Sequence, residues 1–177
     1  VSYGRRVGTG TLDVSVHGLE RTMLNPLPYA AITVDRRGGG ARAVYRGSGK
    51  LAGREAWAAF GFEAELQHDD RLEHNNAGGR PGTDLRKDQE DRVASFGPFA
   101  QAHLALGEAV ELMLGARYDL VRFETRDHLR ANGDASGERT LSAFSPVVGL
   151  TYSPNERISA YGTLATAFQT PTTTELA

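Results

Sequence analysis

Cysteine is absent from the 177-residue chain, which excludes disulfides and thiolate chemistry and is compatible with export through an oxidising compartment. No run of about 18 apolar residues occurs, so a helical membrane span is excluded; a membrane strand needs only about 10 residues of alternating character. The net charge is -2 and no Lys/Arg-rich block is present, so nucleic acid is not an expected partner.

Sequence motifs for catalysis and cofactor binding are also lacking. The segment Gly47-Ser48-Gly49-Lys50 has no glycine at the upstream position that a phosphate loop requires, and Leu51 stands where a hydroxyl residue is needed. Ser, His and Asp residues occur without a strained elbow or another local pattern that would bring them together. We therefore expect neither an enzyme nor a bound cofactor.

Alternation of apolar and polar residues is the main positive signal. The chain contains 21 glycines and 7 prolines, a composition that favours many short segments separated by turns. From Glu55 to Gln67, alternate residues are Ala, Phe or Leu, whereas those between them include Glu63, Glu65 and Gln67. A period of two residues is typical of a β-strand that separates an apolar from a hydrated environment.

Similar alternation predicts an all-β, antiparallel meander of about eight strands forming part of a transmembrane β-barrel. The expected strands are Thr9–Glu20, Pro28–Asp35, Ala41–Arg46, Glu55–Gln67, Pro98–Leu106, Val110–Leu120, Leu141–Ser153 and Arg157–Gln169.

The connections support the same interpretation, because membrane barrels alternate short periplasmic turns with long extracellular loops. Gly107-Glu108 and Ser153–Glu156 are expected to be tight turns, and His68–Glu90 and Asp127–Glu138 to be long external loops. By the same alternation, Arg36–Gly40 is expected to form an external turn. A soluble β-sandwich also alternates, but expected strands of 13 residues exceed its usual strand length.

Several side chains are candidates for specific positions in such a wall. Residues expected to face the lumen are Glu63, Glu65, Gln67, Gln101, His103, Glu111 and Arg117. Aromatic residues near strand ends, expected to form interfacial belts or to pack in a core, are Tyr29, Tyr45, Trp57, Phe96, Tyr118, Phe144, Tyr152 and Tyr161. The weak candidates for a cation site are His68, Asp69, Asp70 and His74, for which a solvated loop is the favoured interpretation.

The C-terminal stretch SPVVGLTYSPNERISAYGTLATAFQTPTTTELA resembles the TonB-dependent outer-membrane receptors. In that family a strand of the type "lYa.y..aF" is followed by "F+.Pt..EL", and an earlier hairpin contains "G.RyD". The matching positions are Arg117, Tyr118, Asp119, Tyr161, Phe168, Pro171, Glu175 and Leu176. The resemblance is good over residues 93–177 and thin before them.

The resemblance implies a 22-stranded barrel around a plug, in the outer membrane of a Gram-negative bacterium. Such a receptor imports ferric siderophores, cobalamin or other scarce nutrients with energy relayed by TonB. We therefore expect residues 1–177 to be a partial barrel domain without plug or final strands, surrounded by outer-membrane lipid, with TonB contacted through the missing plug. The alternatives are a small autonomous outer-membrane barrel or passive pore, and a soluble β-sandwich that acts as a binding module. Ligand-binding candidates in the loops are Arg80, Arg86, Lys87, Arg126 and Arg130.

Overall fold

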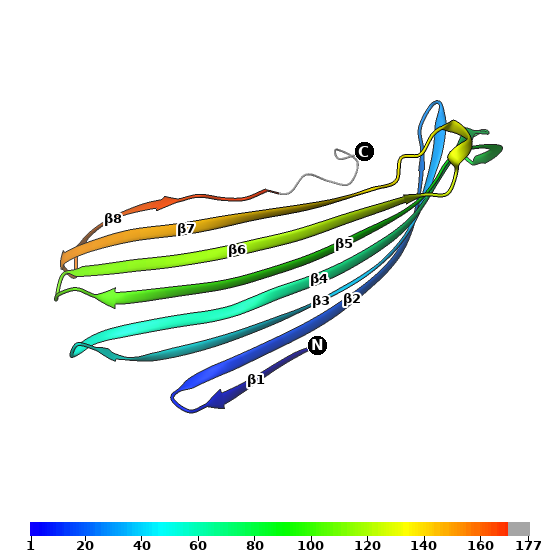
Figure 1. The fold of residues 1–177 in the computed structure, drawn as a ribbon. Coiled ribbons are helices and arrows are strands. Elements are labelled where there is room, and N and C mark those ends of the chain that lie inside the picture. Colours follow the sequence, from blue (N-terminus) through cyan, green and yellow to red (C-terminus); the bar gives the residue numbers. More distant parts are fainter. Residues whose placement is uncertain (170–177) are drawn as a thin grey trace.

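Residues 1–169 form one curved antiparallel sheet in the computed structural model, and this part of the chain is described below (Figure 1). Each strand pairs with the next along the chain, in the order β1 to β8. The strands are β1 (Ser2–Val7), β2 (Gly10–Pro26), β3 (Ala30–Leu51), β4 (Arg54–Asn76), β5 (Pro81–Ala105), β6 (Val110–Asp127), β7 (Gly137–Asn155) and β8 (Ile158–Ala165). A short 3-10 helix, η1 (Arg130–Asn132), lies between β6 and β7.

The predicted meander of eight strands is confirmed, and the described strands make a single layer. A β-sandwich would need a second sheet packed on the first, and a small closed barrel would need β1 to pair with β8. Neither arrangement is found in residues 1–169. The fold is an open section of wall.

Three sequence predictions about the N-terminal half are wrong in detail. β1 was not expected, and the two strands expected at Pro28–Asp35 and Ala41–Arg46 are parts of one continuous strand, β3, which begins at Ala30. The expected turn at Arg36–Gly40 lies within that strand. Its glycines serve close packing, since a Cβ on Gly38 would lie 3.2 Å from the Leu66 carbonyl oxygen and one on Gly40 would lie 2.7 Å from the His17 ring.

The expected long loop at His68–Glu90 is also wrong. β4 continues to Asn76, a turn occupies residues 77–80, and β5 begins at Pro81. Hydrophobic alternation stops after Leu66 although the strand pairing continues, because beyond the membrane both faces of a strand meet water. The expected loop at Asp127–Glu138 is close to the observed connection between β6 and β7.

The two faces of the sheet differ in shape as well as in chemistry. Polar residues such as Glu63 and Asp69 share one face with the buried side chains Val44, Ala59 and Val121. This face is the concave, inner one, since side chains crowd together on the inside of a curved sheet. The opposite face exposes Phe60, Phe62, Leu66, Phe96, Leu114, Tyr118, Leu120, Phe144, Val148, Leu150 and Leu164.

The exposed apolar residues form a band of limited height. On β4 its outward residues run from Ala56 to Leu66, which corresponds to about 33 Å along the strand at roughly 3.3 Å per residue. A tilt of about 45° reduces this to roughly 23 Å, close to the apolar band of about 25 Å in outer-membrane barrels. No helix within residues 1–169 is long and apolar enough to cross a membrane.

The strands extend beyond the apolar band at one end only. β4 projects from Gln67 to Asn76 on the side of the longer connections, whereas at the other end it begins at Arg54, next to the band. Long projections and loops are typical of the extracellular side of such barrels. We therefore assign the connection at residues 128–136 to the outside and the turns at 52–53 and 106–109 to the periplasmic side.

Candidate ligand-facing wall

The inner face of the wall carries a connected set of charged side chains at the level of the apolar band. Arg117 on β6 donates from Nη1 to Glu63 Oε2 at 2.7 Å and from Nε to Asp119 Oδ1 at 2.7 Å. Glu63 Oε1 lies 2.8 Å from Nε of Arg42 on β3. These charges lie on the face away from lipid, as alternation predicts for Glu63 and Arg117.

The other lumen candidates lie on the same inner face. His103 Nδ1 lies 2.6 Å from Glu111 Oε1, and its Nε2 lies 2.9 Å from the Gln101 amide nitrogen. Trp57 packs edge-on against the His103 ring, with 5.0 Å between centroids. Trp57 therefore faces inward and is not part of an outer aromatic belt.

A second inner cluster lies closer to the extracellular end. Arg36 on β3 donates to both carboxylate oxygens of Asp69 on β4, at 2.8 and 2.6 Å, and Gln67 donates to the same carboxylate at 3.1 Å. Only 5% of the Asp69 side chain is exposed. The hydrogen bond with Asp69 raises the pKa of Arg36, burial opposes this shift, and the charge of Asp69 adds to it. The Arg36 guanidinium is thus held in its charged form.

Beside this ion pair lies a hollow of about 660 Å³ in the inner wall. Its polar lining comes from Arg21, Asn25, Arg36, Arg71, Asp69 and Asp91, and its apolar lining from Met23, Leu24, Ile32 and Val34. Asp91 accepts hydrogen bonds from Gln89 and Thr125, each at 2.7 Å.

Two arginines of the hollow, Arg21 and Arg71, carry a positive charge that no carboxylate of the described residues balances. Within residues 1–169, neither Arg21 nor Arg71 has a carboxylate within ion-pair distance. The Nε of Arg71 is buried and has no hydrogen-bond partner among the described residues. A buried guanidinium N–H without a partner is costly, so this position favours an anionic group that would accept its hydrogen bond.

The loop residues chosen from sequence are spread over several environments. Arg80 lies in the exposed turn between β4 and β5, and Lys87 pairs in register with Glu73 on the inner face. Arg86 donates to the Tyr29 carbonyl at 2.9 Å, and Arg130 Nε lies 3.9 Å from Asp134. Arg126 lies on the outer face, paired with Glu124.

The four weak metal candidates are divided by the strand. His68 and Asp70 lie on the outer face of β4, whereas Asp69 points inward to Arg36 and His74 lies further along. Within residues 1–169, no group of three or more His, Asp or Glu side chains is arranged to hold a metal ion. The alternation that a strand imposes on neighbouring side chains explains why this cluster in sequence is not a cluster in space.

Sequence reasoning missed Arg21, Arg36 and Arg71. Each lies at an inward position beyond the end of the apolar band, where the alternation that marks a strand has faded. Their register positions became visible only with the pairing of β2, β3 and β4. Of the family-signature residues, Arg117, Tyr118, Asp119, Tyr161 and Phe168 are described, whereas Pro171, Glu175 and Leu176 lie outside the described residues.

An apolar outer band, a charged inner face and an open, uniformly antiparallel sheet define a segment of transmembrane β-barrel wall. The model of the family "TonB dependent receptor-like, beta-barrel" matches residues 3–177. The chain therefore belongs to this family, which comprises receptors and transporters rather than enzymes.

Solved structures agree at the level of the fold. The alcaligin outer-membrane receptor FauA from Bordetella pertussis is 16% identical, with a TM-score of 0.72 over 92% of this chain and 27% of its own. The unliganded ferric citrate transporter FecA is 9% identical, with a TM-score of 0.74 over 92% and 25%. The ferric yersiniabactin uptake receptor FyuA from Yersinia pestis is 9% identical, with a TM-score of 0.65 over 92% and 26%. The chain spans about a quarter of the length of these proteins.

Proposed function

We propose that the complete protein imports a scarce nutrient across the outer membrane of a Gram-negative bacterium, with energy supplied through TonB, and that the nutrient is an anionic ferric siderophore. The observation that carries this proposal is the inner hollow in which Arg21 and Arg71 have no carboxylate partner in the described chain. The family and the ferric-chelate receptors of similar fold support the substrate class.

The wall would contribute to capture in three ways. The guanidinium groups of Arg21 and Arg71 would donate charge-assisted hydrogen bonds to carboxylate, catecholate or hydroxamate oxygens of the ligand. Met23, Ile32 and Val34 would contact its apolar parts. Four positively charged residues in or near the connections would attract the ligand before it reaches the hollow: Arg80 and Arg130 in the connections, and Arg86 and Lys87 at the start of β5. Arg126 faces outward and is the least suited of the five to this role.

Uptake of radioactive iron tests the proposal. The complete gene would be expressed in a Gram-negative host lacking its own siderophore receptors, and cells would be offered catecholate, hydroxamate and carboxylate ferric complexes. We expect uptake of at least one class, and we expect it to disappear when TonB is deleted. Uptake that persists without TonB would support the passive pore instead, and no uptake of any class would contradict the siderophore assignment.

Exchange of the connections at residues 77–80 and 128–136 for those of a receptor with another specificity provides a second test. Because these connections surround the entrance, the exchange should lower uptake of the original complex. Unchanged uptake would show that they take no part in capture. Substitution of the short periplasmic turn at residues 52–53 serves as the matched control.

A further inference from the structure

A hollow of about 530 Å³ also lies on the outer surface of the wall, where the apolar band ends. Its outward-facing lining consists of Arg37, Gly39, Leu66, His68, Arg92, Ala94, Arg122 and Glu124. The hollow therefore has an apolar floor and a largely basic rim. It lies on the face opposite the ligand-facing wall.

The sizes of neighbouring residues explain the hollow. Gly39, Leu66, Ala94 and Arg122 stand side by side on β3, β4, β5 and β6. Gly39 and Ala94 have little or no side chain, so the surface is low on both sides of Leu66. The next outward-facing row toward the extracellular end has large polar side chains: Arg37, His68, Arg92 and Glu124.

The guanidinium groups of the rim remain accessible although each has a carboxylate neighbour. Arg37, Arg92 and Arg122 are 73%, 47% and 58% exposed, and their partners are Glu20, Glu90 and Glu138. None of these three glutamates lines the hollow. Exposed ion pairs are weak, and a guanidinium has five N–H donors, so each arginine can contact a further anion.

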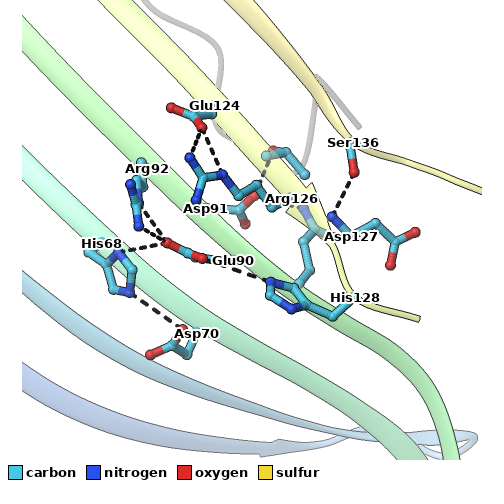
Figure 2. Close-up of polar contacts among 12 residues, drawn as sticks. His68, Asp70, Glu90, Asp91, Arg92, Glu124, Arg126, Asp127, His128 and Ser136 are labelled. Atoms are coloured by element: carbon cyan, nitrogen blue, oxygen red, sulfur yellow. Dashed lines mark hydrogen bonds and ion pairs between the residues drawn. The ribbon is translucent and has the colours of Figure 1, made fainter. Parts of the chain in front are cut away.

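Glu124 is the one carboxylate in the lining of the hollow, and it forms an ion pair with Arg126. Arg126 donates to it from Nε at 2.9 Å, and the Nη2 of Arg126 lies 2.7 Å from the same oxygen (Figure 2). Glu90, just outside the hollow, is approached by Arg92, His68 and His128. The lining of the hollow thus contains three arginines and one carboxylate, Glu124, and this imbalance favours an anion.

The position of the hollow selects the kind of anion. Leu66 and Ala94 are the last lipid-facing residues of their strands; Arg122 lies in register with Ala94, and Arg37 and Arg92 lie one outward-facing row beyond. A molecule that fits both parts must carry hydrocarbon immediately next to an anionic headgroup. A free phosphate ion would contact the rim and leave the apolar floor uncovered.

From this juxtaposition we propose that the hollow binds a phosphorylated lipid of the surrounding leaflet, with the phosphate on Arg37, Arg92 and Arg122 and an acyl chain on Leu66 and Ala94. Guanidinium groups bind phosphate through paired N–H donors, and burial of the chain against the floor adds the hydrophobic contribution. The inference does not depend on which nutrient the receptor transports.

Spin-labelled lipids test the proposal with the complete protein reconstituted in phosphatidylcholine vesicles. The fraction of motionally restricted label would be compared for spin-labelled phosphatidic acid and spin-labelled phosphatidylcholine. We expect a preference for phosphatidic acid that falls by about tenfold in the triple variant R37Q/R92Q/R122Q, the loss expected for roughly one strong charge-assisted contact. A preference unchanged in the triple variant would overturn the proposal.

A second variant keeps all charges and fills the hollow. Ala94→Trp should lower the restricted fraction of phosphatidic acid, whereas Ala100→Trp, on the same outer face within the apolar band, should not. Equal effects of the two variants would contradict a defined site. Inorganic phosphate at millimolar concentration is expected not to displace the lipid; full displacement would show a simple anion site and overturn the lipid assignment.

Discussion

Arg117 on β6 donates a 2.7 Å hydrogen bond to Glu63 on β4, although β5 lies between these two strands. The contact is possible because Gly97, the β5 residue in register with Glu63, has no side chain. A Cβ at Gly97 would lie 2.8 Å from Asp119 Oδ1 and would overlap the guanidinium of Arg117. One missing side chain thus allows three neighbouring strands to be joined on their inner face.

Gly97→Leu should displace Arg117 from Glu63. The obstructing atoms are the ends of flexible side chains, so we expect the wall to remain intact and the protein to lose about 1 kcal/mol of unfolding free energy, the upper range for a partly exposed ion pair. Thermal unfolding of the complete receptor in detergent measures this loss. Gly49→Leu is the control, because nothing lies within 4 Å of a Cβ there; equal effects of both changes would contradict the bridging role.

Gly61→Ala should be more damaging than Gly97→Ala. A Cβ at Gly61 would overlap the carbonyl oxygen of Ala43 and lie 3.0 Å from the Cα of Val44, and a paired backbone cannot move aside. We expect a loss of about 1–3 kcal/mol, as for overpacked interiors. The same unfolding experiment ranks the two variants, and a less stable Gly97→Ala protein would contradict this account.

Arg36→Gln should destabilise the upper wall, because it leaves the buried Asp69 carboxylate with the Gln67 amide as its remaining side-chain donor among the described residues. About 1–3 kcal/mol is expected for an unsatisfied buried group. Arg37→Gln, which removes an exposed pair on the opposite face, should cost less than 1 kcal/mol. If the two variants have the same unfolding midpoint, the Arg36–Asp69 pair does not stabilise the wall as described.

Much of the wall follows from sequence, and the reason is physical. Where lipid meets one face and water the other, as from Ala56 to Leu66, side-chain polarity must alternate and the strand is recognisable. Beyond Leu66 water meets both faces, so the upper parts of β4 and β5 resembled a loop. Gly38–Gly40 resembled a turn, although close approach of neighbouring strands requires small residues there. The arginines of the inner hollow lie in this region, where only strand pairing reveals which residues share a face.

Acid should loosen the outer side of β5 through Glu90. Burial raises the pKa of Glu90. The hydrogen bond from Arg92 and the positive charges of Arg92, His68 and Arg126 together lower it by more than burial raises it, so the pKa lies below the ordinary value of 4.5. A carboxyl group with a lowered pKa contributes stability above its unfolded pKa and loses it as the pH falls through its folded pKa. The protection factors of the β5 amides, corrected for the intrinsic exchange rate at each pH, should therefore fall below about pH 4.5, and less so in Glu90→Gln. Identical acid profiles of the two proteins would contradict this role.

Ligand binding should depend on Arg71 and Arg21 more than on the arginines of the outer face. Arg71→Met keeps much of the side-chain volume and removes the donors that lack a partner within the described chain. We expect the dissociation constant of the ferric complex identified by uptake to rise about tenfold, the value of one charge-assisted hydrogen bond. Arg122→Met, at the outer rim, is the matched control and should bind normally; the reverse order would place the ligand elsewhere.

The central claim is that one face of this wall meets lipid and the other meets water, and a spin-label scan along β4 tests it most directly. Single cysteines would be introduced at positions 56–72 except Gly61, where a side chain would overlap the β3 backbone; residues 1–177 have no cysteine of their own. In the complete protein reconstituted in vesicles, labels at 58, 60, 62, 64 and 66 should be accessible to oxygen and protected from a water-soluble nickel complex, and labels at 59, 63, 65 and 67 should show the reverse. From position 68 onward, labels on both faces of the strand should be accessible to the nickel complex. Equal nickel accessibility at all positions from 58 to 67 would contradict the membrane wall.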